Sequence, residues 1–199
     1  MCDKFYSLCG RFLNAVFLAG IFLCFCNSPS SLACTRTVYL GENDQIVTGR
    51  TMDWTEDVHT NLWIFPRGMD RNGAMGKNSL EWTSKYGSLA ASFYEGATVD
   101  GINEKGLVTN LLYLVESEFP SSEDSRPALV ISAWAQYVLD SFATVAEAVA
   151  SLEQEKFRVA SVMIPNGSKG NGHLAISDPS GDSAIFEYIG GKLVIHHGK

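Results

Sequence analysis

The feature that most constrains the fold of this sequence is the order in which strand-type and helical patterns follow one another along the chain. Strand-type patterns come first, two helical patterns follow them, and strand-type patterns return towards the end. This order is typical of α+β layers, in which helices stack on an antiparallel sheet, whereas parallel sheets need strands and helices that alternate. The sequence therefore predicts an α+β fold. We expect strands at residues 35–40, 46–53, 61–65, 88–94, 108–115, 174–177, 183–189 and 192–196.

Two segments between these strands carry helical signals. Pro127 suits the first position of a helix, and the apolar residues from Leu129 to Val138 recur at helical spacing. Thr144 is followed three residues later by Glu147, which predicts a capping box at the start of a second helix. The first two expected strands flank the turn residues "GEND", so we expect them to form a hairpin.

The first 33 residues have the pattern of a signal peptide. Basic Lys4 and Arg11 precede an almost entirely apolar run at 12–26, and small residues stand at Ser31 and Ala33, where a signal peptidase needs them. The apolar run is too short for a membrane span. We therefore expect cleavage after Ala33, export to the periplasm or the extracellular space, and no stable membrane span afterwards.

The cysteines are concentrated in this leader. Four of the five precede residue 27, and the fifth, Cys34, would be the first residue after cleavage. A lone cysteine cannot form an internal disulfide, so it is predicted to be a free reactive thiol or to pair between molecules. Lipoprotein processing would also leave this cysteine first, with its thiol acylated. That route prefers leucine three residues before the cysteine, where Ser31 stands, but a non-catalytic envelope lipoprotein remains an alternative interpretation.

The composition argues against nucleic acid as a partner, and the positions of the histidines do not predict a metal site. With 15 basic and 22 acidic residues the net charge is −7, which argues against nucleic acid because phosphates need a basic surface. Adjacent His196 and His197 on a strand would point to opposite faces, so we predict no metal site. We also predict no cofactor.

An N-terminal cysteine carries its own general base. Its α-amine, with a pKa of about 7.7–8.0, lies within one residue of the sulfur and becomes basic only after cleavage. Arg50 and Asp53 follow on the next expected strand and could stabilise the thiolate and orient the amine. From spacing alone, however, this pair is better explained as surface charges at a strand end.

These residues and three further motifs resemble one known family. Cys34, Arg50 and Asp53, together with "MDW", "NEKGL" and "NSLEWTSKYGS", are similar to the choloylglycine hydrolase family of linear amide C–N hydrolases. This family includes bile salt hydrolases and penicillin V acylases, and the Gram-negative branch is the most similar. The resemblance implies an N-terminal-nucleophile fold, a four-layer αββα sandwich, of which residues 34–199 would form the N-terminal part of a single domain. It also implies that Cys34 is the nucleophile and that Arg50 and Asp53 act beside it.

The resemblance also suggests the substrate-binding residues. Tyr113 falls where bile salt hydrolases have an asparagine and acylases often have an aromatic residue. With Trp54 and Trp82 it is a candidate to line a pocket for an acyl group. The implied substrates are small amides of three classes, namely penicillin V, N-acyl homoserine lactones and conjugated bile salts. Members of the family often form tetramers, so a homo-oligomer is also expected.

One departure from the family concerns the C-terminus. The family's oxyanion-hole asparagine, in an "NSP" segment, and a second site arginine would follow His197, and neither occurs in these 199 residues. We therefore expect either a fragment of a longer protein or an inactive truncated relative.

Overall fold

The computed structural model describes residues 34–198. The predicted signal peptide, its cleavage site and the four cysteines within it lie outside the described residues. No helix in the described part is long and apolar enough to cross a bilayer.

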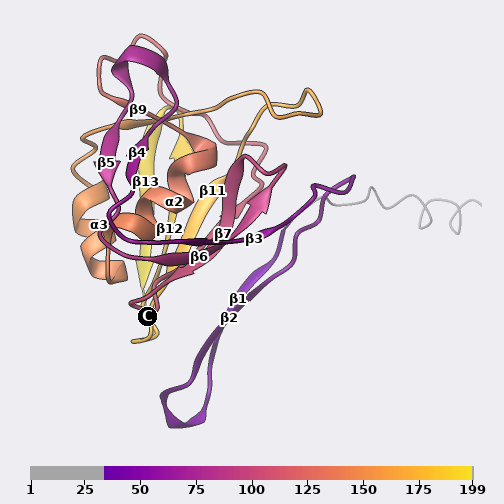
Figure 1. Cartoon of the computed structure of the whole chain (residues 1–199), viewed down its shortest axis with the longest axis vertical. Helices are drawn as coiled ribbons and strands as arrows, with labels where there is room; N and C mark the ends of the chain where they lie inside the picture. The colour runs from indigo at the N-terminus through magenta and orange to yellow at the C-terminus, as the bar shows by residue number, and fades with distance from the viewer. Residues whose placement is uncertain (1–33, 199) are drawn as a thin grey trace, which may run out of the picture. The chain divides into compact units, whose positions relative to one another are not determined.

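A seven-stranded antiparallel sheet is the central element of the described chain (Figure 1). Its spatial order is β13-β12-β11-β8-β7-β6-β3, so the first and the last of its strands along the chain form its two edges. The central strand β8 pairs with β7 and with β11, which places the middle and the last third of the sequence side by side. The strands are β3 (Leu62–Phe65), β6 (Ser88–Phe93), β7 (Ala97–Asn103), β8 (Val108–Leu112), β11 (His173–Ser177), β12 (Ser183–Ile189) and β13 (Lys192–Gly198).

Two helices cover one face of this sheet. Helix α2 (Ile131–Ser141) packs on β6, β7 and β8, and helix α3 (Val145–Leu152) packs on β12. Trp134 of α2 is fully buried, and its ring packs against Phe186 and Tyr188 of β12. Gly101 lets the helix approach β7 closely, because a Cβ there would lie 2.6 Å from Leu139 Cδ1.

The end of α2 is held by hydrogen bonds from one buried side chain. Asn103 of the "NEKGL" motif donates its amide to the carbonyls of Leu139 and Phe142 at the end of α2, 2.9 and 2.8 Å away. Its Oδ1 accepts the backbone N–H groups of Lys105 and Leu107. Asn103 therefore joins the β7–β8 turn to the end of the helix.

The predicted cap of α3 is confirmed. The Thr144 hydroxyl accepts the Glu147 N–H at 3.2 Å, and the Glu147 carboxylate accepts the N–H of Ala143 at 2.8 Å. These bonds satisfy amide groups that the first turn of a helix leaves without intrahelical partners.

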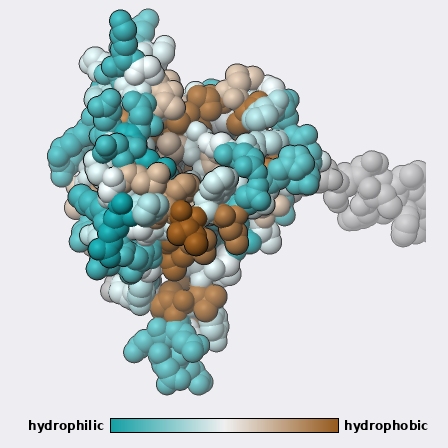
Figure 2. All heavy atoms as spheres, in the orientation of Figure 1, coloured by the Kyte–Doolittle hydropathy of each residue, from teal (hydrophilic) through white to brown (hydrophobic). Residues whose placement is uncertain are grey.

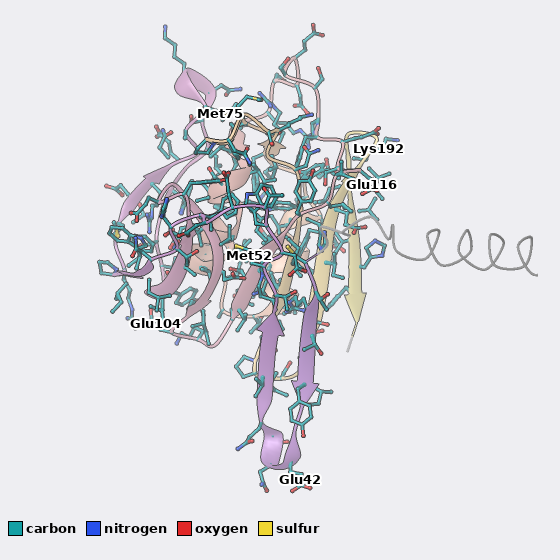
Figure 3. The ribbon with its side chains drawn as sticks, turned by 90° about the vertical axis from the view of Figure 1, so that its right-hand side faces the viewer. Glu42, Met52, Met75, Glu104, Glu116 and Lys192 are labelled. Atoms are coloured by element: carbon teal, nitrogen blue, oxygen red, sulfur yellow. The ribbon has the colours of Figure 1, made fainter. Side chains whose placement is uncertain are left out.

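A separate hairpin contacts the other face of the sheet. It consists of β1 (Arg36–Leu40), the 3₁₀ turn η1 (Glu42–Asp44) and β2 (Ile46–Arg50). Figure 3 shows Glu42 at its tip, away from the sheet, and Met52 near its base. The Thr48 and Ser177 hydroxyls are 2.7 Å apart, which links the hairpin to β11.

Apolar side chains remain exposed on the sheet beside this hairpin. Ile64, Leu89 and Ile102 are register partners across β3, β6 and β7, and each is at least 42% exposed. Figure 2 shows apolar surface in the middle of the viewed face, between hydrophilic ends. Single exposed apolar residues are ordinary, but a row across three strands leaves this sheet face only partly covered.

Smaller elements complete the described fold. The hairpin strands β4 (Asp70–Asn72) and β5 (Glu81–Thr83) flank the 3₁₀ turn η2 (Gly76–Asn78). Strands β9 (Ala128–Val130) and β10 (Arg158–Ala160) form a short parallel pair.

The α+β prediction is confirmed, and the departures are local. All eight expected strands are present, although the second ends at Arg50 and the fifth at Leu112. The expected helix start at Pro127 is wrong, because residues 128–130 pair with β10 and Ala128 O accepts the N–H of Leu80. Strand β7 was not expected, because its sequence "ATVDGIN" contains the turn-type residues aspartate, glycine and asparagine.

Candidate active site

Cys34 lies two residues before the first strand and is held by the base of the hairpin. Thr51 donates its N–H to Thr35 O at 2.9 Å, and Thr35 donates its N–H to the Thr51 hydroxyl at 3.2 Å. This pairing continues the hairpin beyond β1 and holds the segment after β2 beside Cys34. The Cys34 side chain is partly exposed and carries a free thiol.

A mainly apolar pocket opens beside the thiol. Its walls come from the hairpin base, from β6, β7 and β8, from the first turn of α2 and from the segment 162–171 before β11. Cys34 and Arg50 face this pocket together, and most of the other lining residues are apolar. They are Met52, Trp54, Phe93, Ala97, Val99, Leu111, Leu112, Tyr113, Ile131, Ser132, Val162, Ile164, Lys169, Gly170 and Asn171.

Arg50 is the buried cation of this site. Its Nη2 donates to the Leu111 carbonyl at 2.5 Å, and its Nε lies 3.1 Å from Asp100 Oδ1 in an ion pair. Asn110 donates its amide to the same oxygen at 2.8 Å. Burial raises the pKa of Asp100, while the hydrogen bond from Asn110 and the positive charge of Arg50 act in the opposite direction. Arg50 is therefore held in one orientation from β7 and β8.

Three aromatic rings form one side of the pocket. Trp54 packs edge-to-face against Phe93 and Tyr113, each with a centroid distance of 5.4 Å. The Trp54 indole N–H donates to the Tyr94 hydroxyl at 3.1 Å, which fixes the plane of its ring. Edge-to-face packing gives such a wall a defined shape. The wall is suited to a flat apolar group.

The predicted site residues do not all meet. Cys34, Arg50, Trp54 and Tyr113 line one pocket. Asp53 follows the hairpin, is exposed, and accepts the Thr51 hydroxyl at 3.3 Å.

Trp82 lies elsewhere, in a second pocket with Trp63, Phe65 and Arg71. Its indole donates to the fully buried Asp140 carboxylate at 2.8 Å, and burial raises the pKa of that carboxyl. The structure therefore gives Trp82 a packing and hydrogen-bonding environment separate from the cysteine.

Sequence reasoning did not select Met52, Ile131, Lys169 or Asn171. Ile131 begins a helix, and the other three lie in irregular segments that the fold brings to the thiol. Met52 belongs to the "MDW" motif but was not singled out as a pocket residue. No motif marks Lys169 and Asn171, which precede β11 and come to the pocket when β11 pairs with β8. The Asn171 amide donates to Val115 O at 3.1 Å, while its Oδ1 is buried without a hydrogen-bond partner among residues 34–198.

Among residues 34–198, no group of three or more His, Cys, Asp or Glu side chains could hold a metal.

The comparison with known proteins decides the family. The sequence profile of the linear amide C–N hydrolases, choloylglycine hydrolase family, matches residues 34–199, so it begins at the cysteine. The chain belongs to this family. A penicillin V acylase from Pectobacterium atrosepticum is 54% identical, and the alignment covers 86% of this chain and 48% of that relative.

Solved structures agree with this assignment. Penicillin V acylase from Agrobacterium tumefaciens is 57% identical, has a TM-score of 0.75, and is matched over 82% of this chain and 49% of its own. A mutant conjugated bile acid hydrolase from Clostridium perfringens has a TM-score of 0.70 at 22% identity, covering 84% and 51% of the two chains, and shares the fold. The described chain therefore has the N-terminal-nucleophile hydrolase fold that the resemblance implied. It spans about half the length of these relatives.

Proposed function

We propose that this protein hydrolyses linear amides by nucleophilic attack of the Cys34 sulfur. The observation that carries the proposal is the position of this cysteine, which precedes β1 and faces an apolar pocket together with a buried arginine. Membership of the linear amide hydrolase family supports the reaction type. The leader is proposed to be a signal peptide whose removal makes Cys34 the first residue of an exported protein.

In the proposed mechanism, one residue is both nucleophile and proton carrier. The thiol proton moves to the free α-amine of Cys34, and the thiolate attacks the amide carbonyl carbon. The C–N bond then breaks, the leaving nitrogen takes the proton from the α-ammonium, and the acyl group remains on sulfur as a thioester. Water, deprotonated by the same amine, attacks the thioester and releases the carboxylic acid and the thiol.

Neighbouring side chains are proposed to stabilise the charged forms. The Arg50 guanidinium lines the pocket with Cys34, and its positive charge favours thiolate over thiol. Asp53 is proposed to accept a hydrogen bond from the α-ammonium, because the Thr35–Thr51 pairing brings residues 51–53 alongside the first residue.

An aromatic acyl group is the proposed substrate class. Trp54, Phe93 and Tyr113 offer ring edges and faces to the pocket, which suits the phenyl ring of a phenoxyacetyl group better than a broad steroid. Two relatives with more than half of their aligned residues identical are named penicillin V acylases, which supports the same choice. Penicillin V is therefore the first substrate to test, with an N-acyl homoserine lactone and a conjugated bile salt beside it.

The test compares Cys34→Ala and Cys34→Ser with the unchanged protein, produced with its leader in an exporting host. Release of phenoxyacetic acid from penicillin V is measured, and mass spectrometry identifies the first residue and any modification on it. We expect Cys34 as the first residue, no hydrolysis by the alanine variant and little by the serine variant. Undiminished hydrolysis by Cys34→Ala would refute the proposal, and so would a diacylglyceryl group on the sulfur, which would mark an envelope lipoprotein.

A further inference from the structure

Two arginines face each other directly at the base of the hairpin. Arg36 of β1 and Arg50 of β2 are register partners, and both are largely withdrawn from solvent. Like charges directly opposite each other on neighbouring strands are destabilising, so this pairing costs stability unless other groups compensate for it. Sequences break such local rules mainly at functional sites. Arg36 is also only two residues from Cys34, on the same strand path.

A chain of polar contacts links the two guanidinium groups across the sheet. Arg36 Nε donates to Asn110 Oδ1 at 2.7 Å, and the Asn110 amide donates to Asp100 Oδ1 at 2.8 Å. Asp100 Oδ1 in turn lies 3.1 Å from Arg50 Nε. The asparagine is 4% exposed and uses both ends of its amide in this chain, so its orientation is fixed by Arg36 on one side and by Asp100 on the other.

The charges in this chain do not cancel. One carboxylate, Asp100, accompanies two guanidinium groups, so a net positive charge lies beneath the Cys34 end of the hairpin. Among the described residues, Arg36 Nη2 and Arg50 Nη1 are buried without a hydrogen-bond partner. Burial lowers the pKa of Arg36, which means that the charge is held against a desolvation penalty. Because Asp100 balances only one of the two largely buried guanidinium groups, one positive charge is left over and favours an anion nearby.

Other titratable groups surround the same region. Lys169 lines the Cys34 pocket, and Asp53 is exposed after the hairpin. His173 of β11 lies near both arginines: its burial lowers its pKa, Glu187 opposes this change, and Arg36 and Arg50 add to it. The histidine is thus kept neutral near neutral pH, and the two arginines remain the fixed cations.

We propose that Arg36 is a positioning residue for the reaction: through Asn110 and Asp100 it holds the Arg50 guanidinium at the Cys34 pocket. The inference rests on the proposed function, because it takes Cys34 as the nucleophile. Arg36 does not line the pocket, whereas Arg50 does, so Arg36 acts through its neighbours.

The test follows the reactivity of the Cys34 thiol directly. Residues 35–199 contain no other cysteine, so in a protein of residues 34–199 the rate of alkylation by iodoacetamide, measured from about pH 5 to 10, reports the thiolate fraction of Cys34 alone. The variants are Arg36→Met, Arg36→Lys and Asn110→Ala. Arg67→Met is the matched control, because Arg67 is an exposed arginine paired with Glu104 away from the pocket.

We expect Arg36→Met to slow alkylation about tenfold on the acid side of the profile, because the guanidinium charge that favours the thiolate is no longer held at the pocket. Arg36→Lys keeps the charge and should restore much of the normal profile. Asn110→Ala leaves both arginines in the sequence but removes the link, and should shift the profile in the same direction as Arg36→Met. Arg67→Met should follow the unchanged protein.

A purely structural role for Arg36 would lower the urea midpoint without moving the pH profile. The inference is therefore overturned if Arg36→Met and Asn110→Ala, at urea concentrations where both are folded, are alkylated with the profile of the unchanged protein. Penicillin V hydrolysis is measured on the same samples. A shifted thiol profile in a protein whose Cys34→Ala variant still hydrolyses the amide would refute the proposed function, while showing that Arg36 still acts on the Cys34 thiol through Asn110 and Asp100.

Discussion

Replacing Asn103 with alanine should lower the free energy of unfolding much more than replacing an exposed asparagine does. The side chain is 4% exposed and makes four hydrogen bonds, two from its amide to Leu139 O and Phe142 O and two from backbone N–H groups to its Oδ1. This set uses the full hydrogen-bonding capacity of an asparagine amide. A buried hydrogen bond contributes about 0.5–1.5 kcal/mol, so losing all four predicts a loss of about 4 kcal/mol in the free energy of unfolding.

The assay is equilibrium urea unfolding of the processed chain at neutral pH. A loss of this size is a large part of the total stability of a domain, about 5–15 kcal/mol. The control is Asn166→Ala, because Asn166 is exposed and accepts one N–H, from Ser168. It should cost less than about 1 kcal/mol. If both variants lose the same small amount, the four bonds do not have the role that we assign to them.

Asn103→Asp separates the donors from the acceptors. An aspartate keeps acceptors for Lys105 and Leu107 but presents a negative oxygen to two carbonyls at the C-terminus of α2, where the helix dipole is also negative. The folded-state pKa of this carboxyl should therefore lie above its unfolded value of about 3.9. Relative to the unchanged protein, the variant should be most stable below that value and lose stability as pH rises through the folded pKa. An equal deficit at all pH values would contradict this argument.

Three further predictions concern other parts of the fold. Thr144→Ala removes the cap of α3 and should cost about 1 kcal/mol, measured by thermal unfolding; no change in midpoint would mean that the Glu147 contact suffices. Gly101→Ala places a methyl group 2.6 Å from Leu139 Cδ1 and should cost about 1–3 kcal/mol, whereas a neutral result in urea unfolding would show that α2 can shift. The Arg126 hydrogen bonds lower the pKa of Asp124 to about 2. Its stabilising effect should therefore be present above about pH 4 and be lost as pH falls towards 2, and acid titration of Asp124→Asn should lack this component.

The sequence predicted the elements that have a local cause. The hairpin follows from alternating residues around a turn, and the cap of α3 follows from Thr144 and Glu147, so both were predictable. Strand β9 was not, because residues 128–130 become a strand only by pairing with β10, which comes after both helices. Local propensity contains no information about such a distant partner.

The same distinction applies to the candidate site. Cys34 and Arg50 could be selected because the predicted leader ends just before the cysteine and the hairpin returns beside it. Asp100 and Asn110 could not, because they meet Arg50 only after β7 and β8 assemble under the hairpin. Trp82 illustrates the reverse case, since its indole satisfies the buried Asp140 and lies away from the thiol. An aromatic side chain in a sequence does not reveal which of two pockets it will join.

The pairing of Thr35 with Thr51 has a consequence for maturation. It anchors the main chain one position after the cysteine, so after the proposed cleavage the new amino group would be only one residue from a fixed point beside the pocket. An extra amino acid left by inaccurate cleavage would then extend from Cys34 towards the pocket proposed for the substrate and would obstruct it. If the proposed cleavage occurs, its accuracy to one peptide bond would matter as much as the residues in the pocket.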